Sequence, residues 1–173
     1  MRKRLFVLCF VALLTLVGCS NESASEESVD VEPITTIEQY NRMTEQQLVD
    51  ALREPLQKEE VAWTTPSNGQ QITLHQWNYE LDTIPVTFFI VDDEVVRLNY
   101  YIAQWDETLQ ANDAEQLMAY LSVEPEGEEY RIRVDNEKNM QVAWPKPNID
   151  EIYAKHQRGD IQEIRITYDM TPF

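Results

Sequence analysis

The stretch QITLHQWNYEL, residues 71–81, decides the fold, because its side chains alternate in character along eleven positions. Successive side chains of a β-strand point to opposite faces of a sheet, whereas a helix repeats about every 3.6 residues. Trp77, Tyr79 and Leu81 fall on one side of this alternation, opposite a side that carries Gln76 and Asn78. The stretch therefore predicts a strand that turns Trp77, Tyr79 and Leu81 towards the core.

Further strands are predicted on the C-terminal side of this stretch. Two β-rich runs follow, at residues 86–91 and 94–101, and Asp92 and Asp93 between them are typical of a polar turn. This order predicts a hairpin. A last β-rich run, IQEIRITYD at residues 161–169, predicts a strand at the end of the sequence.

Short helices are predicted ahead of the strands. Thr44 and Gln47 form a T-x-x-Q capping box, in which the two side chains bind free backbone N–H groups reciprocally. The apolar stripe of QLVDALREP, residues 47–55, follows and ends at its proline. Residues 112–115 form a second capping arrangement ahead of QLMAYLSVEP, residues 116–125. We therefore expect an α+β fold with short helices packed on one face of an antiparallel sheet.

The two halves of the sequence follow the same order. Both place Gln-Leu at the head of an apolar stripe, end it at Glu-Pro, and continue to a tryptophan, Trp77 or Trp144. We expect one domain, residues 34–173, with two diverged helix-plus-strands repeats at residues 40–105 and 109–170. Helix pairs of this type are common, so an unrelated origin of the two halves is the alternative.

A family resemblance rests on three segments, MTEQQLVDALREP, HQWNYE and VTFFIVDDEVVRLNYY. Their order resembles the unit shared by the small SmpA/OmlA-type lipoproteins and β-lactamase inhibitor protein. The features that match are Met43-Thr44, Pro55, Trp77-x-Tyr79 and residues 89–96. The sequence departs from the pattern at Arg53-Glu54, where a glycine is usual, and its second half lacks Trp-x-Tyr. The resemblance implies an α+β domain with a binding role and names no partner.

The N-terminus has the pattern of an export signal. Residues 2–4 are basic, and residues 5–17 are apolar apart from Thr15. Thirteen helical residues span roughly 20 Å, which is less than the roughly 30 Å of a hydrocarbon core. We therefore expect residues 1–18 to be a cleaved signal peptide and not a permanent membrane span.

The end of this signal, LVGC at residues 16–19, resembles the bacterial lipobox. The resemblance implies that the Cys19 thiol carries a diacylglyceryl group and becomes the new N-terminus. Each buried methylene contributes about 0.8 kcal/mol, so two acyl chains anchor a protein durably where one does not. The alternative is a plain secreted protein in which Cys19 is incidental. Cys9 lies within the signal, which leaves the mature domain without a cysteine for disulfides or thiolate chemistry.

The segment that follows Cys19 has the composition of a flexible linker. Residues 20–33, SNESASEESVDVEP, are rich in Ser and Glu and lack apolar periodicity, so residues 19–33 are expected to form a lipidated tether. Its mean reach is roughly 20 Å.

The net charge of the whole chain is −17. Cleavage of the expected signal peptide would remove three of the 14 basic residues and leave 11 against 31 acidic ones, or −20. This charge excludes nucleic acid as a partner and repels anionic head groups. We expect the extracytoplasmic face of a bacterial membrane, with attachment through lipid alone.

The sequence predicts no catalytic, cofactor-binding or metal site. Its two histidines are His75, in the middle of a predicted strand, and His156, in a polar turn that predicts a surface position. Neither is accompanied by a G-x-S-x-G elbow, a glycine-rich phosphate loop or a zinc spacing. Asp92-Asp93-Glu94 lacks the EF-hand spacing and is typical of a solvated turn.

Aromatic residues are the best candidates for a contact surface. Trp63 in VAWTTPSNG and Trp144 in AWPKPN adjoin loop residues, whereas Trp77 is expected in the core. We therefore expect a non-enzymatic protein-interaction domain at the cell envelope, with an envelope protein as its partner. One alternative is a binding module for cell-wall glycan or peptide that uses exposed aromatic rings. A second alternative is a hydrolase that uses a pair of carboxylates.

Overall fold

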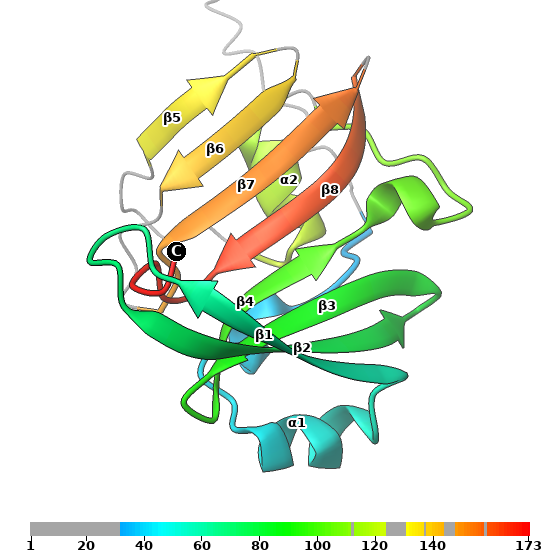
Figure 1. Ribbon diagram of the computed structural model, residues 1–173. Helices are drawn as coiled ribbons and strands as arrows, with labels where there is room; N and C mark the ends of the chain where they lie inside the picture. Colours follow the sequence, from blue (N-terminus) through cyan, green and yellow to red (C-terminus); the bar gives the residue numbers. More distant parts are fainter. Residues whose placement is uncertain (1–31, 112, 124–130, 137, 144–147, 158) are drawn as a thin grey trace, which may run out of the picture.

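The computed structural model describes residues 32–111, 113–123, 131–136, 138–143, 148–157 and 159–173 (Figure 1). The expected signal peptide, Cys19 and Trp144 lie outside the described residues. The elements in chain order are η1 (Ile37–Tyr40), α1 (Glu45–Leu52), β1 (Gln57–Thr64), β2 (Gln71–Leu81), β3 (Ile84–Val91), β4 (Glu94–Tyr100), η2 (Ile102–Gln104), α2 (Ala114–Tyr120), β5 (Arg131–Asp135), β6 (Asn139–Ala143), β7 (Glu151–Gln157) and β8 (Asp160–Thr167).

The strands form one eight-stranded antiparallel sheet in the order β1-β2-β3-β4-β8-β7-β6-β5. Each half of the chain contributes one meander, β1 to β4 and β5 to β8, and a helix precedes each meander. The last strands of the two meanders, β4 and β8, pair at the centre of the sheet. The proposed duplication of residues 40–105 and 109–170 stays a prediction.

The expected α+β fold built on packed helices is wrong, because strands dominate the structure. Helices α1 and α2 have only eight and seven residues, or about two turns each. Strands account for most of the remaining described residues, and β2 alone has eleven. Over the described residues the fold is therefore one antiparallel sheet with two short α-helices.

The strand at residues 71–81 is confirmed as β2. Trp77 and Tyr79 are each 5% exposed, and Leu81 packs against the buried cluster. The predicted hairpin is also confirmed, since β3 and β4 are joined by Asp92 and Asp93. These two residues have φ angles of 50° and 66°, as the central pair of a type I′ turn requires.

The capping box of α1 is confirmed. The Thr44 hydroxyl accepts a hydrogen bond from the Gln47 N–H at 3.2 Å, and Gln47 Oε1 accepts one from the Thr44 N–H at 2.9 Å. In α2 the cap differs from the expected arrangement, because Asp113 is the N-cap and accepts from the Gln116 N–H at 2.8 Å. A carboxylate at this position can satisfy the free N–H without a reciprocal partner.

Both α-helices lie on the same face of the sheet. Leu48 of α1 and Leu117 of α2 belong to the same buried cluster as Phe88 and Ile166 of the strands. Figure 1 shows α2 behind β7 and β8. Along the central strands, every second side chain belongs to this cluster, and those between point to the other face of the sheet. We call that other face the open face. Its residues on the central strands are Gln76, Asn78, Thr87, Phe89, Arg97, Asn99, Gln141, Glu151, Tyr153, Glu163, Arg165 and Thr167.

Candidate functional site

A row of polar residues crosses the open face over six strands. Each member lies directly opposite the next across a strand pair, because the antiparallel register places them so. In order from β2 to β6 the members of this polar row are Asn78, Thr87, Asn99, Arg165, Tyr153 and Gln141.

Hydrogen bonds connect the polar row to its neighbours. Thr87 donates to Asn78 Oδ1 at 2.7 Å. Asn99 and Arg165 both donate to the same Glu163 oxygen, at 3.2 and 3.0 Å. Thr87 and Asn99 are each only 6% exposed. The centre of the row is therefore a bonded network with fixed side chains and not a set of mobile surface groups.

A second row runs beside the first and contains a buried carboxylate. Arg97 Nε donates to the Thr167 hydroxyl at 3.2 Å. Glu151 lies opposite Thr167, is 6% exposed, and accepts a hydrogen bond from Gln141. The Arg133 guanidinium reaches the same carboxylate at 3.9 Å. Among the described residues, Glu151 is thus held by one amide, from Gln141, and one distant cation, Arg133.

The positive charges of the two central arginines, Arg97 and Arg165, are not fully balanced by nearby carboxylates. Burial, and after it the charge of Arg165, lower the pKa of Arg97 to about 10, and the charges of Glu151 and Glu163 do not offset this. Within the described part of the chain, no carboxylate lies within 4 Å of Arg97. Arg165 Nε and Asn99 Oδ1 are buried without a hydrogen-bond partner. Arg97 therefore lies at the centre of the open face, at a point where a carboxylate would lower the electrostatic free energy.

Trp63 lies at the β1 edge of the open face and is half-buried. Its Nε1–H donates to the Pro172 carbonyl at 2.8 Å, and its ring lies 6.3 Å from that of Phe173. The Phe173 ring also lies 6.4 Å from Phe89. Trp63 is thus part of an aromatic group and binds the chain's own residues 172–173. Its role as a contact for another molecule stays a prediction, and Trp144 lies outside the described residues.

The histidines differ in their surroundings. His75 is partly exposed and its Nδ1 lies 2.6 Å from Glu45 Oε1, which ties β2 to α1. His156 was expected in a surface turn, and that expectation is wrong. It belongs to β7 and is 8% exposed, and its Nε2 has no hydrogen-bond partner. The missed signal is the alternation of Ile152, Ala154 and His156, which places the imidazole on the core face.

Two further features of the described residues concern membranes and metals. No helix among them is both long and apolar enough to span a bilayer. They also contain no group of three or more His, Cys, Asp or Glu side chains arranged for a metal ion. Asp92 and Asp93 serve the β3–β4 turn, and Asp93 additionally accepts a hydrogen bond from the Glu45 N–H at 3.0 Å.

Comparison with known proteins gives one structural neighbour at low identity. No protein-family model matches the chain, and no curated protein matches it either. Among solved structures, an extracellular protein containing a SCP domain from Bacillus anthracis str. Ames matches with 15% identity and a TM-score of 0.48. The match covers 84% of this chain and 50% of that chain, so this chain spans about half the length of the matched protein.

Proposed function

We propose that this protein is a lipid-anchored, extracytoplasmic binding domain that holds an envelope protein on the open face of its sheet and catalyses no reaction. The observation that carries the proposal is the placement of Arg97 and Arg165 on the paired strands β4 and β8, in adjacent rows at the centre of the open face. Arginine is enriched at protein interfaces because its planar group donates several hydrogen bonds in a fixed geometry.

The chemistry of the open face indicates what the partner must offer. Arg97 has no carboxylate within 4 Å among the described residues, and the ion pair of Arg165 with Glu163 uses one guanidinium nitrogen, at 3.0 Å. A partner segment that places an Asp or Glu at the edge of these two guanidinium groups, beside the Phe173 ring that covers one face of Arg97, would form charge-assisted hydrogen bonds. The strands fix both side chains in advance, so little conformational entropy would be lost on binding. Because the chain as a whole carries a charge of −17, this contact would select a carboxylate at one point and not acidic proteins in general.

The location of the partner follows from the expected anchor. A diacylglyceryl group on Cys19 and the tether of residues 19–33 would hold the domain within roughly 20 Å of the bilayer. The LVGC motif supports this part of the proposal. It is tested by intact mass and membrane fractionation of the wild type and of Cys19→Ala. The expected result is a lipid mass on the wild type alone, together with loss of the variant from the membrane fraction.

Site-specific cross-linking tests the binding face in the native membrane. A photo-cross-linkable residue in place of Gln141 lies on the open face, and one in place of the exposed Gln46 on α1 serves as the control. We expect a protein adduct from position 141 alone. Arg165→Gln should reduce this adduct several-fold, whereas Arg53→Gln, which removes an exposed charge beyond α1, should not. Equal adducts from both positions, or an adduct unaffected by Arg165→Gln, would rule out the open face as the interface.

A second candidate function is a binding module for cell-wall glycan or peptide. The observation in its favour is the aromatic group of Trp63, Phe89 and Phe173 at the edge of the open face. Flat rings bind sugar rings and peptide side chains with little entropic loss. In this case the isolated domain should sediment with purified cell-wall polymer, and Trp63→Ala should weaken the binding. A domain that stays in the supernatant excludes this candidate.

A further inference from the structure

A cavity of about 520 Å³ lies between the segment that enters the domain, the β2–β3 turn, the segment after η2 and helix α2. Its volume is within the range of sites that hold small molecules, which is about 300 to 1,000 Å³. None of its described lining residues belongs to the open face, so the cavity is separate from the proposed partner site. The apolar side chains of this lining are Pro33, Ile34, Ile84, Trp105, Leu109 and Tyr120.

The inside of the cavity reaches the hydrophobic core. Ile84 and Leu109 line it and belong to the main buried cluster, with 1% and 6% of their surface exposed. Ile34, Trp105 and Tyr120 are half-buried and pack against the same cluster. Apolar side chains and two aromatic rings therefore form the inside of the cavity, and an apolar group placed there would be removed from water.

Hydrogen bonds fix both rings and use their polar atoms. Trp105 Nε1–H donates to the Thr83 hydroxyl at 3.0 Å, and the Tyr120 hydroxyl donates to the Gln110 carbonyl at 3.0 Å. The Ile34 N–H donates to the Tyr120 carbonyl at 2.8 Å, which ties the entering segment to α2. Neither ring therefore has a free donor for a ligand, and both hold their positions before any ligand binds.

Carboxylates form the exposed part of the lining. Glu32, Asp82 and Glu107 are exposed, and the described lining contains no Lys, Arg or His. Within the described part of the chain, none of these three side chains forms an ion pair or a hydrogen bond. The bond between Thr83 and Trp105 brings the turn that carries Asp82 next to the segment that carries Glu107. The charged groups open to a ligand are therefore all negative.

The apolar inside and the negative rim together determine the class of ligand. An ammonium group beside an indole or phenol ring is attracted by the ring as well as by the carboxylates, and Trp is the strongest partner of this kind. An apolar anion would be repelled by the rim and by the net charge of −17, and a bare metal ion would gain nothing from the apolar inside. We propose that this cavity binds a small organic cation, with its apolar body inside and its protonated amine at the carboxylates of Asp82 and Glu107.

Nuclear magnetic resonance of the purified protein tests the proposal with probes that share a phenyl ring and differ in charge. These are 2-phenylethylamine, which is protonated at neutral pH, 2-phenylethanol and 3-phenylpropionate. The Trp105 indole N–H is the reporter, and that of Trp63, which donates to the Pro172 carbonyl, is the control. We expect a saturable shift of Trp105 alone with the amine, an affinity about fivefold lower for the alcohol, and the weakest binding for the carboxylate. No saturable shift of Trp105 with the amine, or equal affinities for the amine and the carboxylate, overturns the proposal.

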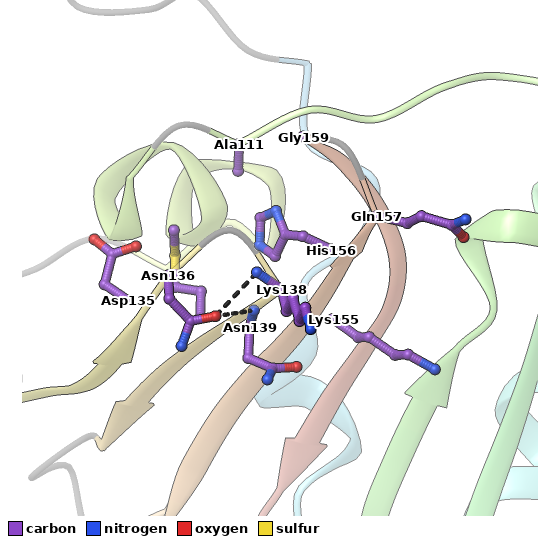
Figure 2. A pocket seen from close by; sticks show the side chains of 10 residues that line it. Ala111, Asp135, Asn136, Lys138, Asn139, Lys155, His156, Gln157 and Gly159 are labelled. Atoms are coloured by element: carbon purple, nitrogen blue, oxygen red, sulfur yellow. Dashed lines mark hydrogen bonds between the residues drawn. The ribbon is translucent and has the colours of Figure 1, made fainter.

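A second cavity provides the control for non-specific binding. Figure 2 shows it beside His156; its lining includes Lys138 and Met140 and shares no described residue with the first cavity. Because of this lysine it lacks a rim that is entirely negative. The Met140 methyl signal should therefore not shift at amine concentrations that saturate Trp105. Equal responses at the two cavities would show that the amine enters any apolar cavity, which contradicts the proposal.

Matched variants separate charge from packing. Asp82→Asn with Glu107→Gln should lower the affinity for the amine about fivefold and leave that for the alcohol unchanged. Glu59→Gln with Glu60→Gln removes the same charge from exposed positions on β1 and should bind as the wild type does. Thermal unfolding shows whether each variant is folded, and added salt, which should weaken binding of the amine alone, gives the same comparison on the wild type. Unchanged amine affinity in the folded Asp82 and Glu107 variant, or in the wild type at high salt, contradicts the proposal.

Discussion

The guanidinium carbon of Arg97 lies 3.2 Å from the centre of the Phe173 ring. This contact places an aromatic ring on one face of the cation that has no carboxylate partner within the described residues. Trp63 holds the same segment through its hydrogen bond to the Pro172 carbonyl. Residues 172–173 therefore contribute to the structure of the open face, and their removal has consequences for stability.

Phe173→Ala should lower the free energy of unfolding by about 2 kcal/mol. A cation–π contact contributes about 0.5–2 kcal/mol and an aromatic pair about 0.5–1.5 kcal/mol beyond its buried area. Both are lost, since the ring touches Arg97, Trp63 and Phe89. Urea denaturation measures the change. Met170→Ala, at a residue that is 36% exposed, is the control and should change stability by less than about 0.5 kcal/mol. Equal effects of the two substitutions would show that the ring contacts add nothing.

Stability should fall as the pH rises above about 10, because buried tyrosines resist ionisation in the folded state. Burial raises the pKa of Tyr79 to about 12, and it also raises the pKa values of Tyr40, Tyr100 and Tyr168. A pKa raised by folding means that the folded state binds more protons than the unfolded state in this range. Its contribution is complete below the unfolded pKa and is lost as the pH rises through the folded value.

Tyr79→Phe isolates one of these groups. At neutral pH it removes the hydrogen bond from the Tyr79 hydroxyl to the Arg53 carbonyl, at 3.1 Å, and should cost about 1 kcal/mol. Between pH 10 and about 12, the slope of stability against pH should be shallower than in the wild type. Chemical denaturation at several alkaline pH values, with tyrosinate absorbance in parallel, provides the measurement. A wild type whose stability is constant across this window would contradict the prediction.

The contact between His75 and Glu45 should hold α1 against the sheet. Glu45→Gln weakens the 2.6 Å contact, and we expect a loss of about 0.5–1 kcal/mol with faster amide exchange in α1 than in β2. A double-mutant cycle with His75→Gln measures the coupling between the two side chains. Asp50→Asn, which alters a contact inside α1 with Gln46, is the control and should leave amide exchange in β2 unchanged. A coupling energy near zero would assign no docking role to the pair.

The alternation of apolar and polar side chains explains which strands could be predicted from the sequence. In β2 one face is buried and the other is polar, so the sequence shows the period of two and gives the correct core face. β1 is an edge strand with four exposed residues at its start, QKEE, so it shows no such period and was not predicted. In β7 the polar His156 and Lys155 conceal the pattern, which led to the wrong assignment of a surface turn.

The open face could not be predicted because it depends on register. Alternation assigns Arg97 and Arg165 to a face of their own strands, but it does not say which residue lies opposite which. The pairing of β4 with β8 joins residues about seventy positions apart, such as Arg97 and Thr167. Local patterns therefore predicted elements and caps, whereas the open face arises from long-range pairing.

The turn between β2 and β3 stores strain that a contact with Trp105 offsets. Thr83 has a φ of 71° next to Asp82 at 48°, although β-branched residues avoid positive φ. Its hydroxyl accepts from Trp105 Nε1–H at 3.0 Å. Thr83→Gly creates the Asp-Gly pair that type I′ turns prefer, and relief of strain should stabilise the protein by about 1 kcal/mol. It also removes the hydrogen bond, at a similar cost of about 1 kcal/mol, so the single variant should be close to neutral.

The two effects separate when the hydrogen bond is already absent. In a Trp105→Phe background, Thr83→Gly should increase the free energy of unfolding by about 1 kcal/mol, because only the relief of strain remains. Urea denaturation of the four proteins in the cycle gives the coupling, which is expected to be about 1 kcal/mol. If Thr83→Gly has the same effect in both backgrounds, the hydroxyl of Thr83 does not stabilise the turn through Trp105. In that case the β-branched residue is simply tolerated at a positive φ, and the turn is held by the β2–β3 pairing alone.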